Sequence, residues 1–257
     1  MMREFGDKDS LVSIVVPVYQ VERFIEETIE CVQKQTYEDW ELLLVDDCSK
    51  DRSCALIEEK AAKDARICLI HQETNQGAAA ARNYGVSYAK GRYLCFLDSD
   101  DLWEPEKLEK EIHFMQEKQA GFVFTGYEFA DEYGKGLGKI VRVPEEIVYS
   151  EALKNTTIFT STVMIDRSKI KDEDIFMPKI ASEDTATWWH LLKVYGKAYG
   201  LDKNLVKYRR SANTLSSNKL EAIKRIWRLY RKQEKLNVFY SAYCMCFWAL
   251  RAVLRRV

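Results

Sequence analysis

The sequence has few of the patterns that mark disulfide-rich, metal-binding or secreted proteins. Its seven cysteines include no Cys-x-x-Cys pair, and several lie inside apolar runs, as buried free thiols do. The three histidines, His71, His113 and His190, lack the spacing of metal ligands, so we expect them to be structural. No apolar signal segment follows the first ten residues. These absences favour a reducing, cytosolic setting.

Internal repeats, low-complexity segments and long membrane-spanning runs are absent as well. The 257 residues are 47% hydrophobic and 31% charged, a composition typical of a globular chain and not of a disordered one. A chain of this length can bury a good core within one domain. We therefore predict a single domain over residues 1–218 and a helical extension over residues 219–257.

The net charge of −1 hides an uneven distribution. Residues 219–257 contain ten Lys or Arg and two Glu, a net charge of +8, which leaves −9 for residues 1–218. In this tail, apolar and basic residues interleave at helical spacing up to Lys235, and residues 238–250 are strongly apolar and aromatic. A basic amphipathic helix of this kind suits an anionic membrane surface. The alternative is that the second tail helix packs against the domain or a partner subunit.

Short apolar runs alternate with stretches of helical periodicity in the first half of the chain. Strands that alternate with helices of about 10–15 residues indicate βαβ units, and hence an α/β fold with a mostly parallel central sheet and flanking helices. The expected strands span 13–18, 40–45, 67–71 and 92–97, and the expected helices span 21–32, 52–65, 77–89 and 105–118.

The alternation loosens after residue 118. A strand over 122–125 precedes a glycine-rich turn at 134–138, which predicts an antiparallel hairpin. The remaining pattern predicts a strand over 158–165, a helix through Tyr195, and short strands near Ala198 and Val206.

Two of the predicted strands end in carboxylates. Asp46 and Asp47 follow one strand, and the acids of residues 98–101 follow another. The carboxyl ends of parallel strands share one edge, where open α/β sheets bind ligands. Crowded carboxylates repel one another unless a cation compensates their charge, and their oxygens suit Mg²⁺ or Mn²⁺ that bridges phosphates. This pattern predicts a metal-assisted site for a phosphorylated ligand, with an acidic loop before the helix at Pro105 as the alternative.

A third segment, residues 75–83, places a run of alanines at a helix start beside Arg82. Small residues let a ligand approach the backbone, and the Arg82 guanidinium can bind oxygens in a fork. Each feature alone also fits a capped helix, an Ala-rich packing face or a surface arginine. Their coincidence in this order favours a ligand site.

Five segments follow one another over roughly the first four-fifths of the chain, namely Val16–Tyr19, Val45–Asp51, Asn75–Asn83, Leu97–Asp101 and Glu183–Asp184. Taken in this order, they resemble the motifs of family 2 glycosyltransferases. The resemblance implies a GT-A fold for the catalytic domain, a nucleotide-diphosphate sugar donor, most readily UDP-linked, Mn²⁺ or Mg²⁺, and inversion at the anomeric carbon. It is greatest with the non-processive enzymes of bacterial surface-polysaccharide assembly, such as teichuronic-acid and O-antigen transferases, since no Gln-x-x-Arg-Trp follows the last motif.

Carried over by position, the resemblance assigns Asp100 to the metal. Asp46 is expected to hold its loop, and Asp101 is the weakest candidate among the acids. The residues implied in nucleotide binding are Pro17, Val18 and Tyr19 at the base and ribose, Asp47 at the ring NH, Arg82 at the edge of the base pocket, and Asp98 and Ser99 at the ribose and diphosphate.

Glu183 and Asp184 match the family position of the catalytic base. An inverting transfer needs a carboxylate on the acceptor's side to take the hydroxyl proton, while cations stabilise the departing diphosphate. We expect Asp184 to be the base and Glu183 to orient it or to contact donor or acceptor. Acids also favour the first turn of a helix, and the two roles are compatible.

Four further residues are weaker candidates for acceptor or diphosphate contacts. Ser161 matches a stretch that faces the acceptor in relatives, with a plain strand position as the alternative. Trp188 offers an aromatic face to a sugar, although core packing explains it better. Arg209 and Arg210 precede a polar stretch at 213–218 that would order over a diphosphate or form a plain surface loop.

The working hypothesis is a metal-dependent enzyme that transfers one sugar to a lipid-linked saccharide, located in the cytoplasm and peripherally on the inner face of the cell membrane. A nucleotidyltransferase is one alternative, but residues 15–23 lack its glycine-rich phosphate loop. A non-catalytic binding module is the other, and the intact Asp100 and Asp184 argue against it. We expect no nucleic-acid partner, and leave open the sugar, the linkage and whether the chain forms a homo-oligomer.

Overall fold

The computed structural model describes residues 9–210 and 219–254, so the predicted polar stretch at 213–218 lies outside the described residues. Its strands are β1 (Val12–Val18), β2 (Trp40–Asp46), β3 (Ile67–His71), β4 (Tyr93–Phe96), β5 (Leu102–Trp103), β6 (Phe122–Ala130), β7 (Gly136–Val141), β8 (Glu146–Val148), β9 (Val163–Asp166) and β10 (Lys197–Arg209). Its α-helices are α1 (Ile25–Gln33), α2 (Ser53–Ala61), α3 (Ala78–Tyr88), α4 (Lys107–Glu117), α5 (Tyr149–Ala152), α6 (Glu183–Tyr195), α7 (Lys219–Arg228) and α8 (Val238–Leu254). Short 3₁₀ turns, η1 (Thr160–Thr162) and η2 (Asp172–Asp174), and a π-helical segment, η3 (Leu229–Gln233), complete the list.

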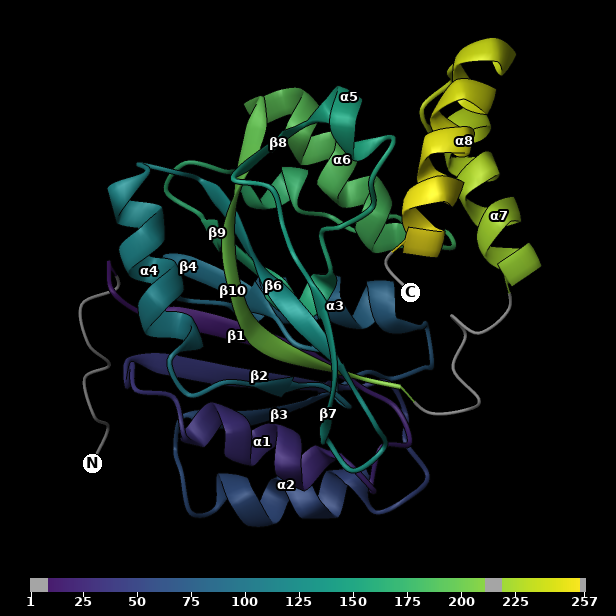
Figure 1. Cartoon of the computed structure of the whole chain (residues 1–257). Coiled ribbons are helices and arrows are strands. Elements are labelled where there is room, and N and C mark those ends of the chain that lie inside the picture. The colour runs from purple at the N-terminus through teal and green to yellow at the C-terminus, as the bar shows by residue number, and fades with distance from the viewer. Residues whose placement is uncertain (1–8, 211–218, 255–257) are drawn as a thin grey trace.

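One sheet runs through the molecule in the order β3-β2-β1-β4-β9-β6-β10-β5, with β7 on β6 and β8 on β10 (Figure 1). The first four strands of this order pair in parallel. β9 lies antiparallel between β4 and β6, and β6 pairs in parallel with β10, so β6 and β10 run in the same direction as β1. The prediction of a mostly parallel sheet is therefore confirmed.

The central strands are apolar on both faces because helices cover both sides of the sheet. Val15, Leu43 and Phe96 pack with residues of α3 and α6, whereas their neighbours Ile14, Leu42 and Cys95 pack with residues of α1, α2 and α4. Full burial of one such aliphatic or aromatic side chain contributes about 1.5–3 kcal/mol. This two-sided core fixes the ends of the strands, from which the acidic loops emerge.

Helix α3 lies especially close to the sheet at Gly85. A Cβ at this position would lie 2.4 Å from Val15 Cγ1, so a larger residue would push the helix away from β1. The close approach places the start of α3 beside the carboxyl ends of β1 and β2.

Two strand predictions were wrong in detail. The segment predicted as a strand over 158–165 forms η1 first and becomes β9 only at Val163. The turn brings Ser161 against the loop after β4 and Thr160 against Asp184, contacts that a continuous strand would not give. The two short strands expected near Ala198 and Val206 form one strand, β10, whose pairing with β6 shifts register between Leu201 and Val206.

Other expectations were close. The hairpin predicted around residues 134–138 is confirmed by the antiparallel pair of β6 and β7. The helix predicted from Pro105 begins at Lys107, and the helix through Tyr195 begins at Glu183.

The C-terminal helices pack on α6 through part of their surface. Tyr230 stacks on Trp189 at a centroid distance of 5.4 Å, and Ile226 and Cys244 belong to the same core cluster. Trp248 Nε1 donates a hydrogen bond to Thr156 Oγ1 at 3.0 Å. Within the described residues, every helix is too short or too polar to cross a membrane.

Candidate active site

A cavity of about 220 Å³ opens at the carboxyl edge of β1, β2 and β4. All seven residues predicted to bind the nucleotide line it together with the predicted metal ligand. The lining residues are Pro17, Val18, Tyr19, Asp47, Ala78, Ala81, Arg82, Asp98, Ser99 and Asp100. The structure thus brings four of the five sequence motifs into one place.

Asp47 fixes the wall of this cavity that leads into α3. Its carboxylate accepts the backbone N–H groups of Gln76 and Gly77, each at 2.7 Å. Gly77 has a φ of +87°, a conformation that L-residues rarely adopt, and it turns the chain into the helix. Asp46 holds its own loop, as expected, because its Oδ1 accepts the N–H of Ser49 at 3.0 Å.

Hydrogen bonds with buried polar groups hold the acidic loop after β4, residues 98–101, in place. Asp101 is fully buried, and its carboxylate accepts the Ser161 hydroxyl at 2.6 Å and the Arg209 N–H at 3.1 Å. Ser161 Oγ in turn accepts the N–H of Asp98 at 3.0 Å, and Thr28 Oγ1 lies 2.9 Å from the carbonyl oxygen of Ser99. The buried acid therefore holds the loop, while Asp98 and Asp100 face the cavity.

The acids of this loop share strong mutual repulsion. Burial, with the charge of Asp98, raises the pKa of Asp100 to about 6. Burial and the charges of Asp100 and Asp98 raise the pKa of Asp101 well above its ordinary range. A divalent cation between Asp98 and Asp100 would relieve this repulsion, and carboxylate oxygens are the ligands that Mg²⁺ and Mn²⁺ prefer. These carboxylate ligands thus fit the predicted metal.

Arg82 links the cavity to the last motif. Its guanidinium lies 2.6 Å from Asp98 Oδ1 and 2.9 Å from Glu183 Oε1 and is largely buried. Although burial lowers the pKa of Arg82, the charges of Asp98 and Glu183 raise it above its ordinary value. Burial and the neighbouring Asp184 raise the pKa of Glu183, and Arg82 opposes them. One arginine therefore joins carboxylates from two distant motifs.

Asp184 lies in the first turn of α6, after Ser182 in the left-handed conformation with a φ of 62°. Its Oδ2 accepts the Thr160 hydroxyl at 3.1 Å, and its Oδ1 accepts the N–H of Thr185 at 2.6 Å. Unlike Glu183, Asp184 forms no ion pair within residues 9–210 and 219–254. Its half-buried carboxylate is thus held in place by hydrogen bonds with Thr160 and Thr185.

The four weaker candidates lie outside the cavity. Ser161 and Trp188 are buried, and Trp188 packs on Phe96 and Phe122 at centroid distances of 5.9 and 5.6 Å, so the structure favours core packing for it. Arg209 is 2% exposed and pairs with Glu27 Oε2 at 2.6 Å, which favours a structural role. The Arg210 guanidinium lies 5.2 Å from the ring centre of Phe129.

Sequence reasoning missed three residues that position the site. Thr28 and Thr160 hold the acidic loop and Asp184 through single hydroxyl groups, and no periodicity distinguishes them from ordinary helix or strand residues. Asn83 exchanges two hydrogen bonds of 2.8 Å with the backbone of Met177, which ties the segment before Glu183 to α3. Only its place in the third motif drew attention to Asn83.

Comparison with known proteins agrees with this geometry. Residues 13–173 match the family model described as glycosyl transferase family 2. A putative teichuronic acid biosynthesis glycosyltransferase of Bacillus subtilis, TuaG, is 42% identical over 248 residues, which cover 96% of this chain and 98% of that protein. An Escherichia coli enzyme, the UDP-Glc:α-D-GlcNAc-diphosphoundecaprenol β-1,3-glucosyltransferase WfgD, is 39% identical over 85% of each chain.

Solved structures agree on the fold. Staphylococcus aureus TarS in complex with UDP-GlcNAc has a TM-score of 0.67 at 22% identity, covering 93% of this chain and 70% of that one. The mannosyltransferase PcManGT of Pyrobaculum calidifontis, in complex with GDP-Man and Mn²⁺, has a TM-score of 0.69 at 15% identity, covering 94% and 75%. These matches cover most of this chain and most of each matched chain. The chain therefore belongs to glycosyltransferase family 2 and is a glycosyltransferase with a GT-A fold.

Proposed function

We propose that the chain is an inverting, metal-dependent glycosyltransferase that moves one sugar from a UDP-linked donor to a lipid-linked saccharide in the assembly of a bacterial cell-surface polysaccharide. The observation that carries the proposal is the position of Arg82, which joins the donor cavity to the motif that contains Asp184. By this proposal, the donor would bind beside Asp98 on one side of the buried guanidinium, and the base would follow Glu183 on the other.

The nucleotide end of the donor fits the cavity wall built by β1, β2 and α3. Tyr19 is about half exposed and offers a ring face to a base, and Asp47 keeps lone pairs beside those that accept Gln76 and Gly77. The cavity is smaller than the roughly 300–1,000 Å³ of a typical ligand site, so the sugar must extend beyond it. Asp100, at the cavity's acidic end, lies where the diphosphate would follow.

Asp98 and Asp100 would hold the divalent cation. Such a cation, when bound, stabilises the negative charge of the departing diphosphate. Arg82 holds Asp98 in place through the 2.6 Å contact, so that this carboxylate keeps one orientation toward a cation.

Asp184 is the proposed general base. It takes the proton of the acceptor hydroxyl, and its orientation is fixed by Thr160 and by the N–H of Thr185. Glu183 is the positioning residue, because its contact with Arg82 anchors the first turn of α6. When Asp184 takes the hydroxyl proton, the acceptor oxygen can attack the anomeric carbon on the face opposite the diphosphate. The bond from that carbon to the diphosphate breaks, UDP leaves, and the anomeric configuration is inverted.

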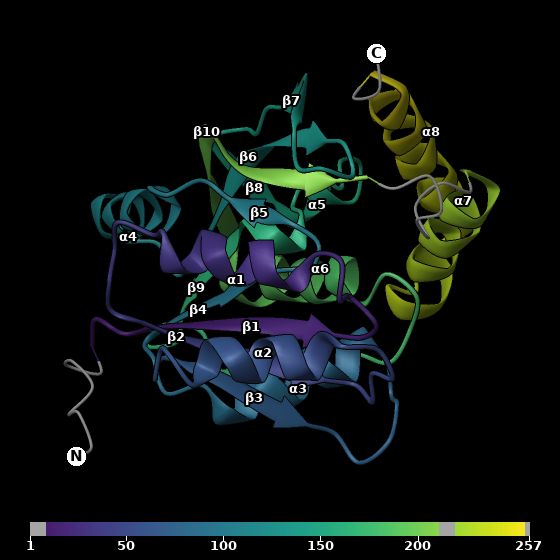
Figure 2. The same ribbon diagram turned by 90° about the horizontal axis from the view of Figure 1, so that it is seen from below.

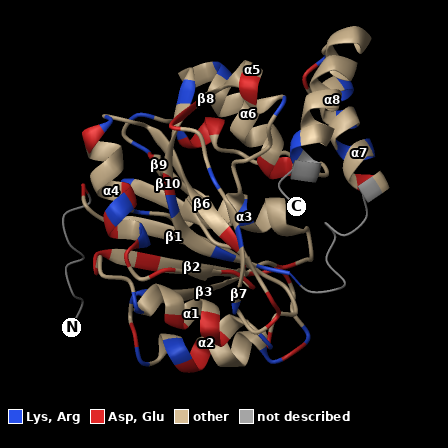
Figure 3. Ribbon diagram, in the orientation of Figure 1, with Lys and Arg blue, Asp and Glu red and all other residues tan. Residues whose placement is uncertain are grey.

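The acceptor proposal is supported by the C-terminal helices. α8 exposes four apolar residues at helical spacing, Phe239, Tyr243, Phe247 and Leu250, whereas Cys244 is buried in the core cluster. Figure 3 shows α8 almost without charge beside the basic α7. In two views, both helices lie at the end of the molecule toward which β1 points (Figures 1 and 2). The residues that line the cavity include Pro17 and Val18, at that same end of β1. A lipid-linked acceptor would meet the enzyme at that end.

The name of one relative supports the same acceptor class, and the name of another supports polysaccharide assembly. WfgD is named for a diphosphoundecaprenol-linked substrate and UDP-Glc, and TuaG for teichuronic acid biosynthesis. By this proposal the protein works in the cytoplasm, peripherally on the inner face of the cell membrane.

The test uses the purified full chain with Mn²⁺, a panel of UDP-sugars and a polyprenyl-diphosphate-linked saccharide. We expect one sugar to be added, with the anomeric configuration inverted in the product by NMR. Pyrophosphate release from UTP and a sugar 1-phosphate would instead identify a nucleotidyltransferase. Donor binding without hydrolysis or transfer, under conditions in which WfgD is active, would identify a binding module.

A further inference from the structure

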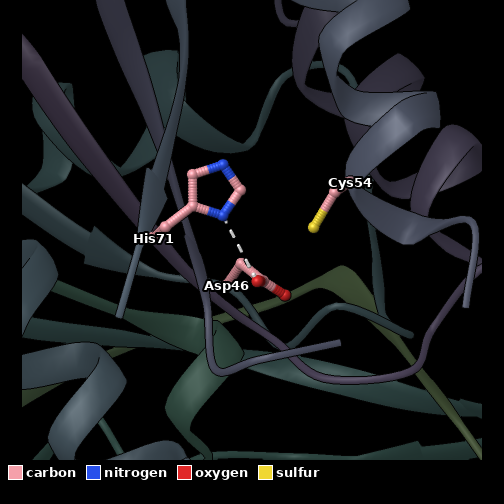
Figure 4. Close-up of side chains that lie close together, drawn as sticks. All are labelled: Asp46, Cys54 and His71. Atoms are coloured by element: carbon pink, nitrogen blue, oxygen red, sulfur yellow. Dashed lines mark hydrogen bonds and ion pairs between the residues drawn. The ribbon is translucent and has the colours of Figure 1, made fainter. Parts of the chain in front are cut away.

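A second cluster of chemically reactive side chains lies where the ends of β2 and β3 meet the start of α2. It consists of Asp46 at the end of β2, His71 at the end of β3 and Cys54 in the first turn of α2. Asp46 and His71 are register partners in the sheet. One ligand atom from each of the three residues lies within 4.8 Å of the other two, as Figure 4 shows. Sequence spacing had predicted only a structural role for His71.

The carboxylate of Asp46 is already oriented for this cluster. Its Oδ1 accepts the N–H of Ser49, while its Oδ2 lies 3.4 Å from Nδ1 of His71. Such a bond to the distal oxygen is what fixes a carboxylate ligand in metal sites. The Asp46 side chain is buried, Cys54 is half-buried, and 57% of the His71 ring is exposed, so an ion can enter from the His71 side.

The cluster also concentrates acceptor groups. The Cys54 Sγ lies within 4.8 Å of the ligand atoms of Asp46 and His71. The thiolate is the form of cysteine that binds a metal, so an ion at this place would displace the thiol proton.

We propose that Asp46, Cys54 and His71 bind one Zn²⁺ ion, at a site separate from the donor cavity. A thiolate, an imidazole and a carboxylate form a ligand set that suits zinc, whereas Mg²⁺ and Mn²⁺ prefer oxygen ligands alone. Three protein ligands leave the fourth tetrahedral position to water. On binding, Zn²⁺ displaces the Cys54 proton to solvent, and the charges of thiolate and carboxylate balance the ion.

The geometry requires only a small adjustment. Zinc–ligand distances of about 2.0–2.3 Å place tetrahedral ligand atoms roughly 3.3–3.6 Å apart. The Asp46–His71 contact already has this length, and side-chain rotation of Cys54 closes the remainder. The ion would connect β2, β3 and α2 one residue before Asp47, and so would stabilise the loop that supports the donor cavity.

The experiment titrates metal-free full-length protein with Zn²⁺ against a chromophoric chelator, and with Co²⁺ as a spectroscopic probe. We expect one equivalent of Zn²⁺ to bind with a Kd of about 1 μM or below, and Co²⁺ to produce a thiolate-to-metal charge-transfer band. Excess Zn²⁺ should raise the Tm, because it binds the native state. Cys54→Ser should abolish the Co²⁺ band, and Cys54→Ser and His71→Ala should each weaken Zn²⁺ binding at least about tenfold.

Cys68→Ser is the matched control, since Cys68 is an exposed thiol on β3 and only three residues before His71. It should leave the stoichiometry and the Co²⁺ band unchanged, and Asp100→Asn should do the same because Asp100 lies in the other site. Circular dichroism confirms that each variant is folded. Tight Zn²⁺ binding that survives both Cys54→Ser and His71→Ala would overturn the proposal, as would folded wild-type protein that binds no Zn²⁺ or shows no charge-transfer band.

Discussion

Asp98, Asp100 and Asp101 follow the same strand, yet each has a different environment. Asp98 pairs with Arg82, Asp100 lines the cavity, and Asp101 is buried against Ser161 and the backbone of Arg209. A carboxylate that is buried and hydrogen-bonded stabilises the loop, while a carboxylate that faces the cavity can bind a cation. Neighbouring acids of one motif therefore have separate tasks.

Asp100→Asn should abolish most transfer and leave the fold intact, because an amide is a poorer ligand for Mn²⁺ at nearly the same size. We expect the rate to fall by at least about 10²-fold and metal-dependent donor binding to weaken. Transfer assays and calorimetric titration of UDP with Mn²⁺ measure the two effects. Asp202→Asn, at an exposed ion pair with Arg142, is the control. Near-normal activity of Asp100→Asn together with activity that resists EDTA would refute the metal assignment.

Asp184→Asn should lower the transfer rate by about 10²-fold or more, as loss of a general base does. Its affinity for the nucleotide should stay within about twofold, because Asp184 acts on the proton of the acceptor. Transfer rates and UDP titrations on the same preparation give both values. If rate and nucleotide affinity fall together, Asp184 belongs to donor binding or to the structure instead.

The connection between α2 and β3 shows how a single turn can be stabilised by charge. Arg66 binds Asp64 in a fork, through Nε at 3.0 Å and NH2 at 2.8 Å, and its guanidinium lies 3.7 Å from the ring centre of Trp40. Hydrogen bonds from Arg66 lower the pKa of Asp64 to about 2, against the opposing effect of burial. This turn places β3, and with it His71, beside β2.

Asp64→Asn should destabilise the protein by about 1 kcal/mol at pH 7, a value reduced for the partial exposure of Arg66. The folded-state pKa of Asp64 lies below the unfolded value of about 3.9, so its stabilisation is present above pH ~4 and is lost as the pH falls toward 2. Urea unfolding of wild type and variant between pH 7 and 3 measures the difference. A stability gap that stays constant over this range would contradict the linkage.

At the scale of the whole molecule, α8 with its exposed apolar residues lies at the end toward which β1 points (Figures 1 and 2). The cavity lies at the same, carboxyl end of β1. The arrangement depends on Tyr230 and Cys244, which join α7, η3 and α8 to the core around Trp189. Core packing uses one face of these helices, and the proposed membrane docking would use the exposed apolar residues of α8.

Phe239→Asp should weaken binding to anionic liposomes by about tenfold or more, because Phe239 is 89% exposed and its burial in lipid contributes about 1.5–3 kcal/mol. Donor hydrolysis should not change, while transfer to a lipid-linked acceptor should fall. Liposome co-sedimentation and both activity assays provide the readouts. Tyr133→Asp, at a residue 78% exposed in the β6–β7 turn, is the matched control. Equal liposome binding by the two variants would exclude the proposed docking.

Sequence periodicity was sufficient for the parallel strands β1 to β4 and for most helices, whereas the candidates that line the cavity came from the resemblance to family motifs. Apolar runs indicate strands buried on both faces, and parallel strands end at one edge, so the acids after β2 and β4 had to meet. The seven nucleotide-binding candidates and Asp100 followed from motifs that are each continuous in the chain.

The tertiary structure alone decided the contacts between segments far apart in the sequence. Ser161 forms hydrogen bonds with Asp98 and Asp101, which lie about sixty residues away in the sequence. The backbone N–H of Arg209 donates a hydrogen bond to Asp101 as well. His71 lies beside Asp46 and Cys54. Periodicity reports which face of an element is buried, but not which residue of another element opposes it. That choice depends on register, on the turn at η1 and on side-chain direction, and these are fixed only when the whole core is packed.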